Sequence, residues 1–300
     1  MTGRLREALR SGVFAVTAEI GPPRGADLGA IRDAAAVLRA WVHAANITDN
    51  QGAQVRVSSL AGSVAALAAG LEPVMQMTTR DRNRIALQSD LLAAGALGVP
   101  NLLLMTGDRP DRGDHAEATG VFDLSSGALL RAARALRDDG VLLSGRQVEP
   151  PPDYLLGAVD LGSGSPDRVA AKIEDGAEFV QTQFVFDVPA FAGWLGRVRD
   201  LGLDRRCGIL AGVGPIRSLR ALAVIAGLPG VTVPDALVRR LRGVPEDRVA
   251  AEGMTACAET VAALRELPGL AGVHVMSVGH ERGVPEILAA AGLRPVLPTT

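Results

Sequence analysis

A carboxylate that follows directly after a buried apolar run is the first candidate for chemistry in this sequence. Residues 102–105 carry four consecutive large apolar side chains, as expected of a parallel strand covered on both faces. Asp108 lies just beyond that run, and Gly107 lets the backbone turn sharply there. α/β proteins place their chemistry at the carboxyl ends of parallel strands. A Gly-Asp pair is also common in plain turns, so the other strand ends decide between the two interpretations.

Polar side chains also stand at the expected carboxyl ends of the other β-rich runs. These are Glu19, Thr48, Asp49, Gln76, Thr78, Asp160, Gln181 and Gln183. The set is rich in acids and amides and suits a heterocycle with N–H donors and ring nitrogens, with one carboxyl group as acid or base. It lacks the clustered histidine or cysteine of a metal hydrolase, so we predict no metal site. Taken singly, Thr48, Asp49 and Asp160 are better explained as caps and turn residues.

The elements that would position these side chains alternate along the chain. β-Rich runs are expected at residues 13–20, 42–48, 73–77, 100–105, 154–159, 179–184, 208–213 and 273–277. Helical patterns fall at residues 27–40, 58–69, 82–97, 126–138, 166–175, 189–201, 216–226 and 246–267. Eight strands, most followed by a helix, predict a single (β/α)8 TIM barrel, with a doubly wound open sheet as the alternative. No composition shift divides residues 1–300, so we expect one domain, with the long segment 107–124 covering a site.

Composition limits the classes of partner. The chain has 300 residues, of which 48% are hydrophobic and 21% charged, and a net charge of -2, so neither nucleic acid nor an anionic membrane is expected as a partner. Two cysteines far apart in sequence indicate neither a disulfide framework nor a zinc site, and a cytoplasmic location fits best. No apolar run approaches membrane-spanning length. The first residues suit a short amphipathic helix better than a signal peptide.

Several ordered motifs resemble the catalytic barrel of the methylenetetrahydrofolate reductase family. Residues 18–24 (AEIGPPR) are similar to that family's Glu-Phe-Phe-Pro-Pro-Arg signature, and residues 106–108 (TGD) resemble its Arg-Gly-Asp element. Residues 172–177 (KIEDGA) and 181–187 (QTQFVFD) resemble its Lys-x-x-x-Gly-Ala and Thr-Gln-Phe-Phe-Phe-Asp run. The likeness extends from about the first strand to the C-terminus.

The resemblance implies reduction of 5,10-methylenetetrahydrofolate to 5-methyltetrahydrofolate. Glu19 would be the general acid that helps open the five-membered ring to an iminium at N5, after which a hydride adds to the exocyclic carbon. Asp108 would stabilise the developing cation beside the pterin, and Gln183 would contact the pterin through an amide that both donates and accepts. Glu19 then needs a raised pKa, which burial beneath the substrate would provide. The structural alternative for Glu19 is a cap on the turn before Pro22.

The departures from the family pattern concern the flavin. Members typically bind FAD, but Gln76 replaces a histidine here, Thr106 and Ala171 replace arginines, and residues 158–163 replace a Tyr-Pro segment that also supplies a histidine. The retained positions are Thr48, Asp108 and Lys172. Each lost polar contact is worth about 1 kcal/mol or more, so their combined loss weakens flavin binding severely. We therefore expect NADH or NADPH to donate hydride directly to the folate, with FAD as the family's usual alternative.

These matches assign residues to two parts of the site. We predict that Thr48, Gln76, Gln181 and Gln183 bind substrate. The predicted cofactor set is Thr106, Gly107, Gly162, Ser163, Gly164, Ser165 and Lys172. The Gly-Ser-Gly-Ser run precedes a helical pattern, so its amides could receive phosphate, but Ser165 and Pro166 are equally well explained as an N-cap and a first helical residue. Lys172, about two turns further on, would meet a phosphate or solvent, and its place inside a helix argues against a Schiff-base aldolase.

A second class of function stays open at this point. The chain could be a non-catalytic folate-binding barrel, or a partner-dependent subunit of a methyl-transfer system. Retention of both Glu19 and Asp108 favours catalysis, because a mere binder has less need of the acid. The choice between NADH and NADPH, and whether the chain forms a homo-oligomer, are left undecided by the sequence.

Overall fold

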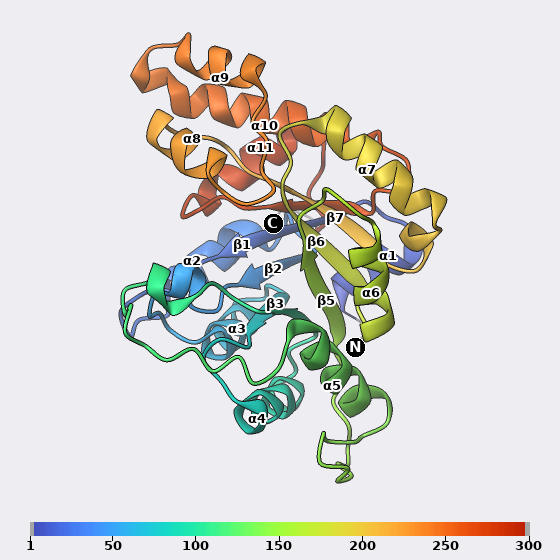
Figure 1. The fold of residues 1–300 in the computed structure, drawn as a ribbon. Coiled ribbons are helices and arrows are strands. Elements are labelled where there is room, and N and C mark those ends of the chain that lie inside the picture. The colour runs from blue at the N-terminus through green and yellow to red at the C-terminus, as the bar shows by residue number, and fades with distance from the viewer. Residues whose placement is uncertain (1–2, 298–300) are drawn as a thin grey trace.

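The computed structural model describes residues 3–297 and contains a closed barrel of parallel strands (Figure 1). The strands are β1 (Ala15–Ile20), β2 (Ala44–Ile47), β3 (Pro73–Thr78), β4 (Asn101–Met105), β5 (Leu155–Asp160), β6 (Phe179–Phe184), β7 (Gly208–Val213) and β8 (Gly272–Val275). Each strand pairs with the next, and β1 also pairs with β8, which closes the sheet. The predicted (β/α)8 barrel is confirmed, and the open doubly wound sheet is excluded.

Helices surround the barrel because each strand needs an apolar cover on its outer face. They are α1 (Arg4–Ser11), α2 (Gly29–Leu38), α3 (Ser59–Ala68), α4 (Arg84–Ala96), α5 (Ser126–Asp138), α6 (Asp167–Asp175), α7 (Val188–Asp200), α8 (Leu219–Ala226), α9 (Asp235–Arg242), α10 (Val249–Arg265) and α11 (Val284–Ala290). Local sequence fixes many of their starts. The side chains of Ser58, Asn83, Ser125, Asp187 and Ser218 each accept a hydrogen bond from an amide of the first turn.

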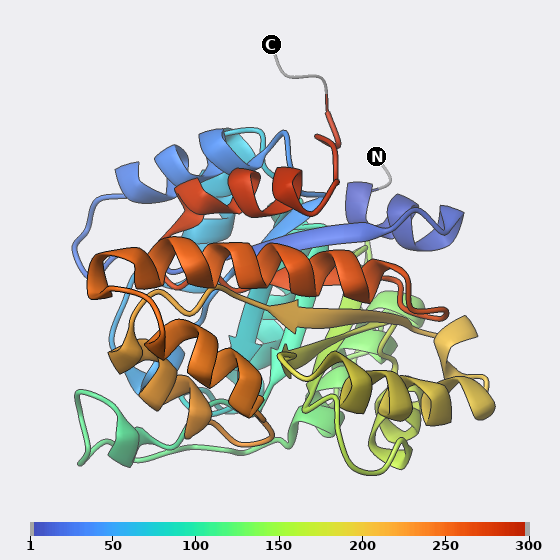
Figure 2. The same ribbon diagram turned by 90° about the horizontal axis from the view of Figure 1, so that it is seen from above.

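Two regions differ from the predicted helices. The pattern at residues 216–226 becomes helical only at Leu219, and the pattern at 246–267 divides into a short 3-10 turn followed by α10. α9 and α11 were absent from the predicted set of helices, since eight- and seven-residue segments carry too few turns to show a periodic pattern. Figure 2 shows α10 along the outside of the barrel, with α9 and α11 packed beside it.

The base of the barrel is sealed by α1. Leu5 and Ala8 pack against residues at the starts of the strands, among them Val74 and Phe179. The carboxylate of Glu72, which is buried, accepts hydrogen bonds from the backbone amides of Arg4 at 2.5 Å and Leu5 at 3.1 Å. An anion at this helix end compensates the exposed amides and the helix dipole. The chemistry is therefore confined to the opposite, carboxyl-terminal rim.

None of the helices within residues 3–297 combines the length and apolar character needed to cross a membrane.

Replacing Leu5 by Ala tests the seal. The Leu5 side chain is fully buried, so its loss should lower the free energy of unfolding by about 2–5 kcal/mol, through lost apolar burial and the cavity left behind. Chemical denaturation followed by circular dichroism measures the change. Arg10→Ala, on an exposed position of the same helix, is the matched control, and equal stability of the two variants would contradict the proposed seal.

Candidate active site

The carboxyl ends of the strands surround an open cavity of about 1220 Å³. Eight of the predicted site residues line it: Glu19, Gln76, Thr106, Gly107, Asp108, Lys172, Gln181 and Gln183. Three further strand-end side chains that the sequence singled out, Asp49, Thr78 and Asp160, lie in the same wall. The closure of the barrel thus brings together residues that are up to about half the chain apart.

The other predicted site residues lie outside this wall. Thr48 is fully buried, and its hydroxyl has no hydrogen-bond partner within the described residues. The backbone carbonyls of Ser163 and Gly164 accept hydrogen bonds from arginine side chains. The Ser165 hydroxyl accepts from the amide of Asp167 at 3.2 Å, just where α6 begins. The Gly-Ser loop, including Gly162, therefore serves the start of the helix in this structure, with Pro166 rather than Ser165 at the cap position.

Glu19, near the end of β1, has the properties expected of an acid. Its side chain is 8% exposed, and this burial raises its pKa to about 7. Hydrogen bonds from Gln51, whose Nε2 lies 3.2 Å from Glu19 Oε1, and from Gln76 lower the pKa, while the nearby charge of Glu281 raises it. Burial dominates, so the Glu19 carboxyl group has a pKa near neutral, well above its ordinary value of 4.5.

Asp108 directly follows Gly107, whose backbone conformation suits only glycine. Gly107 has a φ of +86°, and a Cβ atom there would lie 2.9 Å from the Thr78 side chain. The Asp108 side chain is exposed to the cavity, while its backbone carbonyl accepts a hydrogen bond from Arg80 at 3.4 Å. The segment that follows, residues 107–124, reaches across to the β2 loop, where the Asp114 carboxylate accepts from the amide of Val55 at 3.2 Å. Of this segment only Gly107 and Asp108 line the cavity, so its role as a cover of the site stays a prediction.

Arg80 is a site residue that the sequence did not reveal. Its guanidinium is buried and donates two hydrogen bonds of 2.7 Å to the carboxylate of Asp81. It also donates to the backbone carbonyls of Asn50 and Asp108. One side chain thereby ties together the segments that follow β2, β3 and β4. An adjacent Arg-Asp pair in sequence is typical of a solvated turn, so no sequence signal marked its role.

Asp49 and Asp160 are held by partners within the protein, and only Asp160 makes the local bond of a turn, which it accepts from the amide of Gly162 at 3.1 Å. Asp49 Oδ2 accepts from the amide of Thr78 at 2.8 Å and from its hydroxyl at 3.0 Å, and it also pairs with Arg82. Asp160 Oδ2 lies 3.3 Å from both Arg168 Nε and Lys172 Nζ. Lys172 is consequently paired with a carboxylate, whereas the sequence had suggested a phosphate or solvent.

A buried polar network forms the floor of the cavity. The side-chain amides of Gln181 and Asn46 bond each other twice, at 2.7 and 3.1 Å. Asn46 Nδ2 also lies 3.4 Å from His274 Nε2, and Thr17 Oγ1 lies 2.9 Å from His274 Nδ1. Because an amide NH2 can only donate, the network assigns the ring proton to Nδ1, which donates to Thr17. Burial lowers the pKa of His274 to about 3, so the ring is neutral.

Gln183 lies beside this floor, on β6. Its Oε1 accepts from the amide of Phe184 at 3.0 Å, and within the described residues its NH2 group has no partner. The pairing of β6 with β7 is irregular between Gln181 and Phe184. Because side chains two residues apart on a strand point to the same face, Gln181 and Gln183 both face the cavity.

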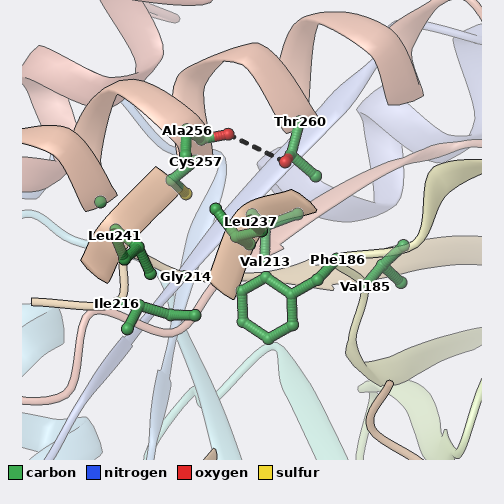
Figure 3. Close-up of a pocket in the computed structure, with 11 residues that line it drawn as sticks. Val185, Phe186, Val213, Gly214, Ile216, Leu237, Leu241, Ala256, Cys257 and Thr260 are labelled. Atoms are coloured by element: carbon green, nitrogen blue, oxygen red, sulfur yellow. Dashed lines mark hydrogen bonds between the residues drawn. The ribbon is translucent and has the colours of Figure 1, made fainter. Parts of the chain in front are cut away.

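A second, much smaller cavity of about 10 Å³ lies between the end of β7, α9 and α10 (Figure 3). Its lining is mostly apolar, and its Thr260 hydroxyl donates to the carbonyl of Ala256 at 2.9 Å. The thiol of Cys257 faces it, and burial raises its pKa to about 12, which leaves it unreactive. A space of this size holds about one water molecule and no organic ligand.

Residues 3–297 contain no group of three or more His, Cys, Asp or Glu side chains that could hold a metal ion.

A buried acid of near-neutral pKa, amides beside it and an open cavity at the carboxyl rim define a (β/α)8 barrel with an enzyme-like site. Comparison with protein families makes this more specific. The model of the methylenetetrahydrofolate reductase family matches residues 4–292, and the chain belongs to that family.

Curated relatives agree with the family assignment. A probable methylenetetrahydrofolate reductase (NADPH) of Caenorhabditis elegans is 25% identical over 233 residues, covering 75% of this chain and 33% of the relative. Methylenetetrahydrofolate reductase 1 of Schizosaccharomyces pombe is 24% identical over 234 residues, covering 74% of this chain and 36% of the relative. The chain thus spans about a third of the length of the curated relatives it matches.

Solved structures share the fold at low identity. A protein from Clostridium thermocellum, described as binding two copies of 5-methyl-5,6,7,8-tetrahydrofolic acid, superposes with a TM-score of 0.62 at 15% identity, covering 95% of this chain and 96% of its own. An F420-dependent secondary alcohol dehydrogenase superposes with a TM-score of 0.57 at 11% identity, covering 93% and 99%. These likenesses show the barrel fold.

The pKa of Glu19 predicts how stability depends on pH. Between the ordinary value of 4.5 and about 7, the folded protein keeps a proton that the unfolded chain has lost, so stability falls as pH rises through that window. Above about pH 7, Glu19 is ionised in the folded state, and the free energy of unfolding is lowered by the full cost of burying that charge. Glu19→Gln should remove that cost and gain a few kcal/mol over the native protein at pH 8, since one pKa unit is about 1.4 kcal/mol.

Denaturant titrations at pH 5 and pH 8 measure this difference. Glu286→Gln, which changes an exposed glutamate, should leave the pH dependence as it is in the native protein. A Glu19→Gln variant with the native pH dependence would mean that Glu19 is not buried as described.

Proposed function

We propose that the protein reduces 5,10-methylenetetrahydrofolate to 5-methyltetrahydrofolate and takes the hydride directly from NADH or NADPH. The observation that carries the proposal is Glu19, a carboxyl group with a pKa of about 7 in the cavity wall of a barrel of this family. A group that titrates near working pH can both donate and recover a proton, as general acid catalysis requires.

Glu19 would give its proton to N10 of the folate. The bond from N10 to the methylene carbon then breaks, and N5 carries an iminium. The hydride adds to that carbon and completes the methyl group. Neighbouring Gln51 and Gln76 hold the Glu19 carboxylate by hydrogen bonds, which stabilises it after the proton has left.

Two further side chains would hold the pterin. The Asp108 carboxylate, exposed to the cavity, can accept hydrogen bonds from the N–H donors of the ring and favour the cation that develops at N5. The NH2 group of Gln183 can donate to a ring acceptor. The oxygen and the nitrogen of the Gln181 amide are both bonded to Asn46. Gln181 would therefore contact the pterin as part of the cavity floor and limit how deeply the ring can bind.

The residues do not fit the flavin that the family commonly uses. The family's retained lysine, Lys172, is bonded to the buried carboxylate of Asp160, which also holds Arg168. Thr48, another retained position, is fully buried away from the cavity wall. Lys172, the cation expected to meet a phosphate, is thus already paired with an acid of the protein itself, and no step of the proposed reaction passes through FAD.

The size of the cavity supports direct transfer between two ligands. Its volume of about 1220 Å³ exceeds the roughly 300–1,000 Å³ that one small-molecule site occupies. The structural neighbour from Clostridium thermocellum is described as binding two folate molecules. A folate and a nicotinamide can therefore be present together, as a hydride transfer without an intermediate carrier demands.

Direct transfer predicts the kinetics of the purified protein. Freshly prepared protein should show no flavin absorption and should oxidise NADH or NADPH only when methylenetetrahydrofolate is present. Initial rates at varied concentrations of both substrates should give intersecting double-reciprocal lines, because both ligands must be bound at once. Parallel lines together with a flavin spectrum would refute the direct mechanism. A colourless protein with no turnover, even after FAD is added, would indicate a folate-binding barrel without catalysis.

Glu19→Gln tests the acid. The variant keeps the size and hydrogen bonding of the side chain but has no proton to donate, so turnover should fall by about 100-fold or more while folate binding is kept. Stopped-flow measurement of nicotinamide oxidation and calorimetric titration with folate separate the two effects. Glu286→Gln is the control and should retain full activity. Turnover of Glu19→Gln close to the native rate would remove Glu19 from the mechanism.

A further inference from the structure

One face of α8 lines the cavity beyond the residues assigned above. Six side chains of this segment recur at the three- and four-residue intervals that place them on one side of a helix. They are Arg217, Arg220, Ala221, Val224, Ile225 and Leu228. In Figure 1, α8 lies beside α9, next to the ring of strands. The face is graded along its length, with cations at its beginning and apolar side chains further on.

The two arginines are the cations of the cavity wall that lack an acidic partner. The others are paired, Arg80 with Asp81, and both Arg168 and Lys172 with Asp160. Arg217 and Arg220 are exposed, and no carboxylate in the described part of the chain lies within salt-bridge distance of them. Guanidinium groups without a partner at the edge of a ligand cavity attract an anion, and their planar geometry matches phosphate oxygens.

The apolar half of the face begins one turn further along. Val224 is 62% exposed, and Leu228 is partly exposed beside it. Apolar side chains left open in a cavity wall mark a place where a ligand covers them. The ligand that fits this face therefore has an anionic group and, a short distance further on, a flat ring with little charge.

We propose that this face of α8 binds the adenosine diphosphate half of the nicotinamide donor. The pyrophosphate lies on Arg217 and Arg220, and the adenine covers Val224 and Leu228. A folate tail, in which the p-aminobenzoyl ring adjoins the carboxylates of glutamate, is the other ligand with this chemistry, and measurements with polyglutamylated folate distinguish it. The inference rests on the proposed function and moves the phosphate site from the Gly-Ser loop before α6 to the segment after β7.

The test is binding of ADP-ribose, which is the donor without its nicotinamide, to flavin-free protein by titration calorimetry. Arg217→Gln combined with Arg220→Gln should weaken this binding by about tenfold or more, because charge-assisted hydrogen bonds are lost at an exposed site. Raised salt should weaken native binding in the same direction. Arg242→Gln, an exposed arginine on α9 outside the cavity wall, is the matched control and should bind as the native protein does.

Turnover gives a second readout. The double variant should show a raised KM for NADH and NADPH, with an unchanged KM for methylenetetrahydrofolate and for reduced nicotinamide mononucleotide, which lacks the adenosine half. Unchanged affinity for ADP-ribose would overturn the inference. A raised KM for polyglutamylated folate alone would also overturn it and assign the arginines to the folate tail.

The two proposals can fail separately. If the native protein binds ADP-ribose through these arginines but transfers no hydride to folate, the nucleotide site is supported and the proposed reaction is refuted. Native protein that turns over but does not bind ADP-ribose keeps the reaction and refutes this site.

Discussion

Burial of one carboxyl group at the end of β1 is the constraint on which the site depends. A glutamate in water is ionised at neutral pH, and only exclusion of water brings the pKa of Glu19 to about 7. That exclusion needs the neighbouring strands in place, with Gln76 on β3 and the β2 loop with Gln51 close beside it. The near-neutral pKa of Glu19 thus depends on the closed barrel, and an isolated peptide with the same sequence would not show it.

The interior of the barrel has an apolar layer at its base and a polar layer above it. At the base, α1 and the first residues of the strands form an apolar plug, stabilised by Glu72 beneath the helix start. Above it, Thr17, Asn46, Gln181 and His274 form a polar layer in which each buried amide and ring nitrogen has a partner. Such a layer resists rearrangement, because breaking one bond leaves a buried polar group unsatisfied. It provides a rigid polar floor for a ligand.

The sequence predicted the parts of the molecule that depend on local pattern. Apolar runs located the eight strands, β6 and β7 to the residue, and the polar residues at the ends of those runs line one cavity, with the exception of Thr48. Contacts between side chains of different elements could not be predicted from the sequence. Nothing in the local sequence showed that Asp160 neutralises Lys172, or that Arg80 and the α8 arginines belong to the cavity wall. Those facts follow from how helices and loops pack against the strand ends, which the local sequence pattern does not show.

The bonds made by Arg80 have a consequence for how this barrel can diversify. Its guanidinium holds the β2 and β4 segments through backbone carbonyls, at Asn50 and at Asp108, and within residues 3–297 its one side-chain hydrogen-bond partner is the adjacent Asp81. A carbonyl is present whatever residue carries it. The side chains that face the ligand on both segments can therefore be exchanged in evolution while the frame that presents them stays the same. The rim can acquire a new specificity without having to rebuild its support.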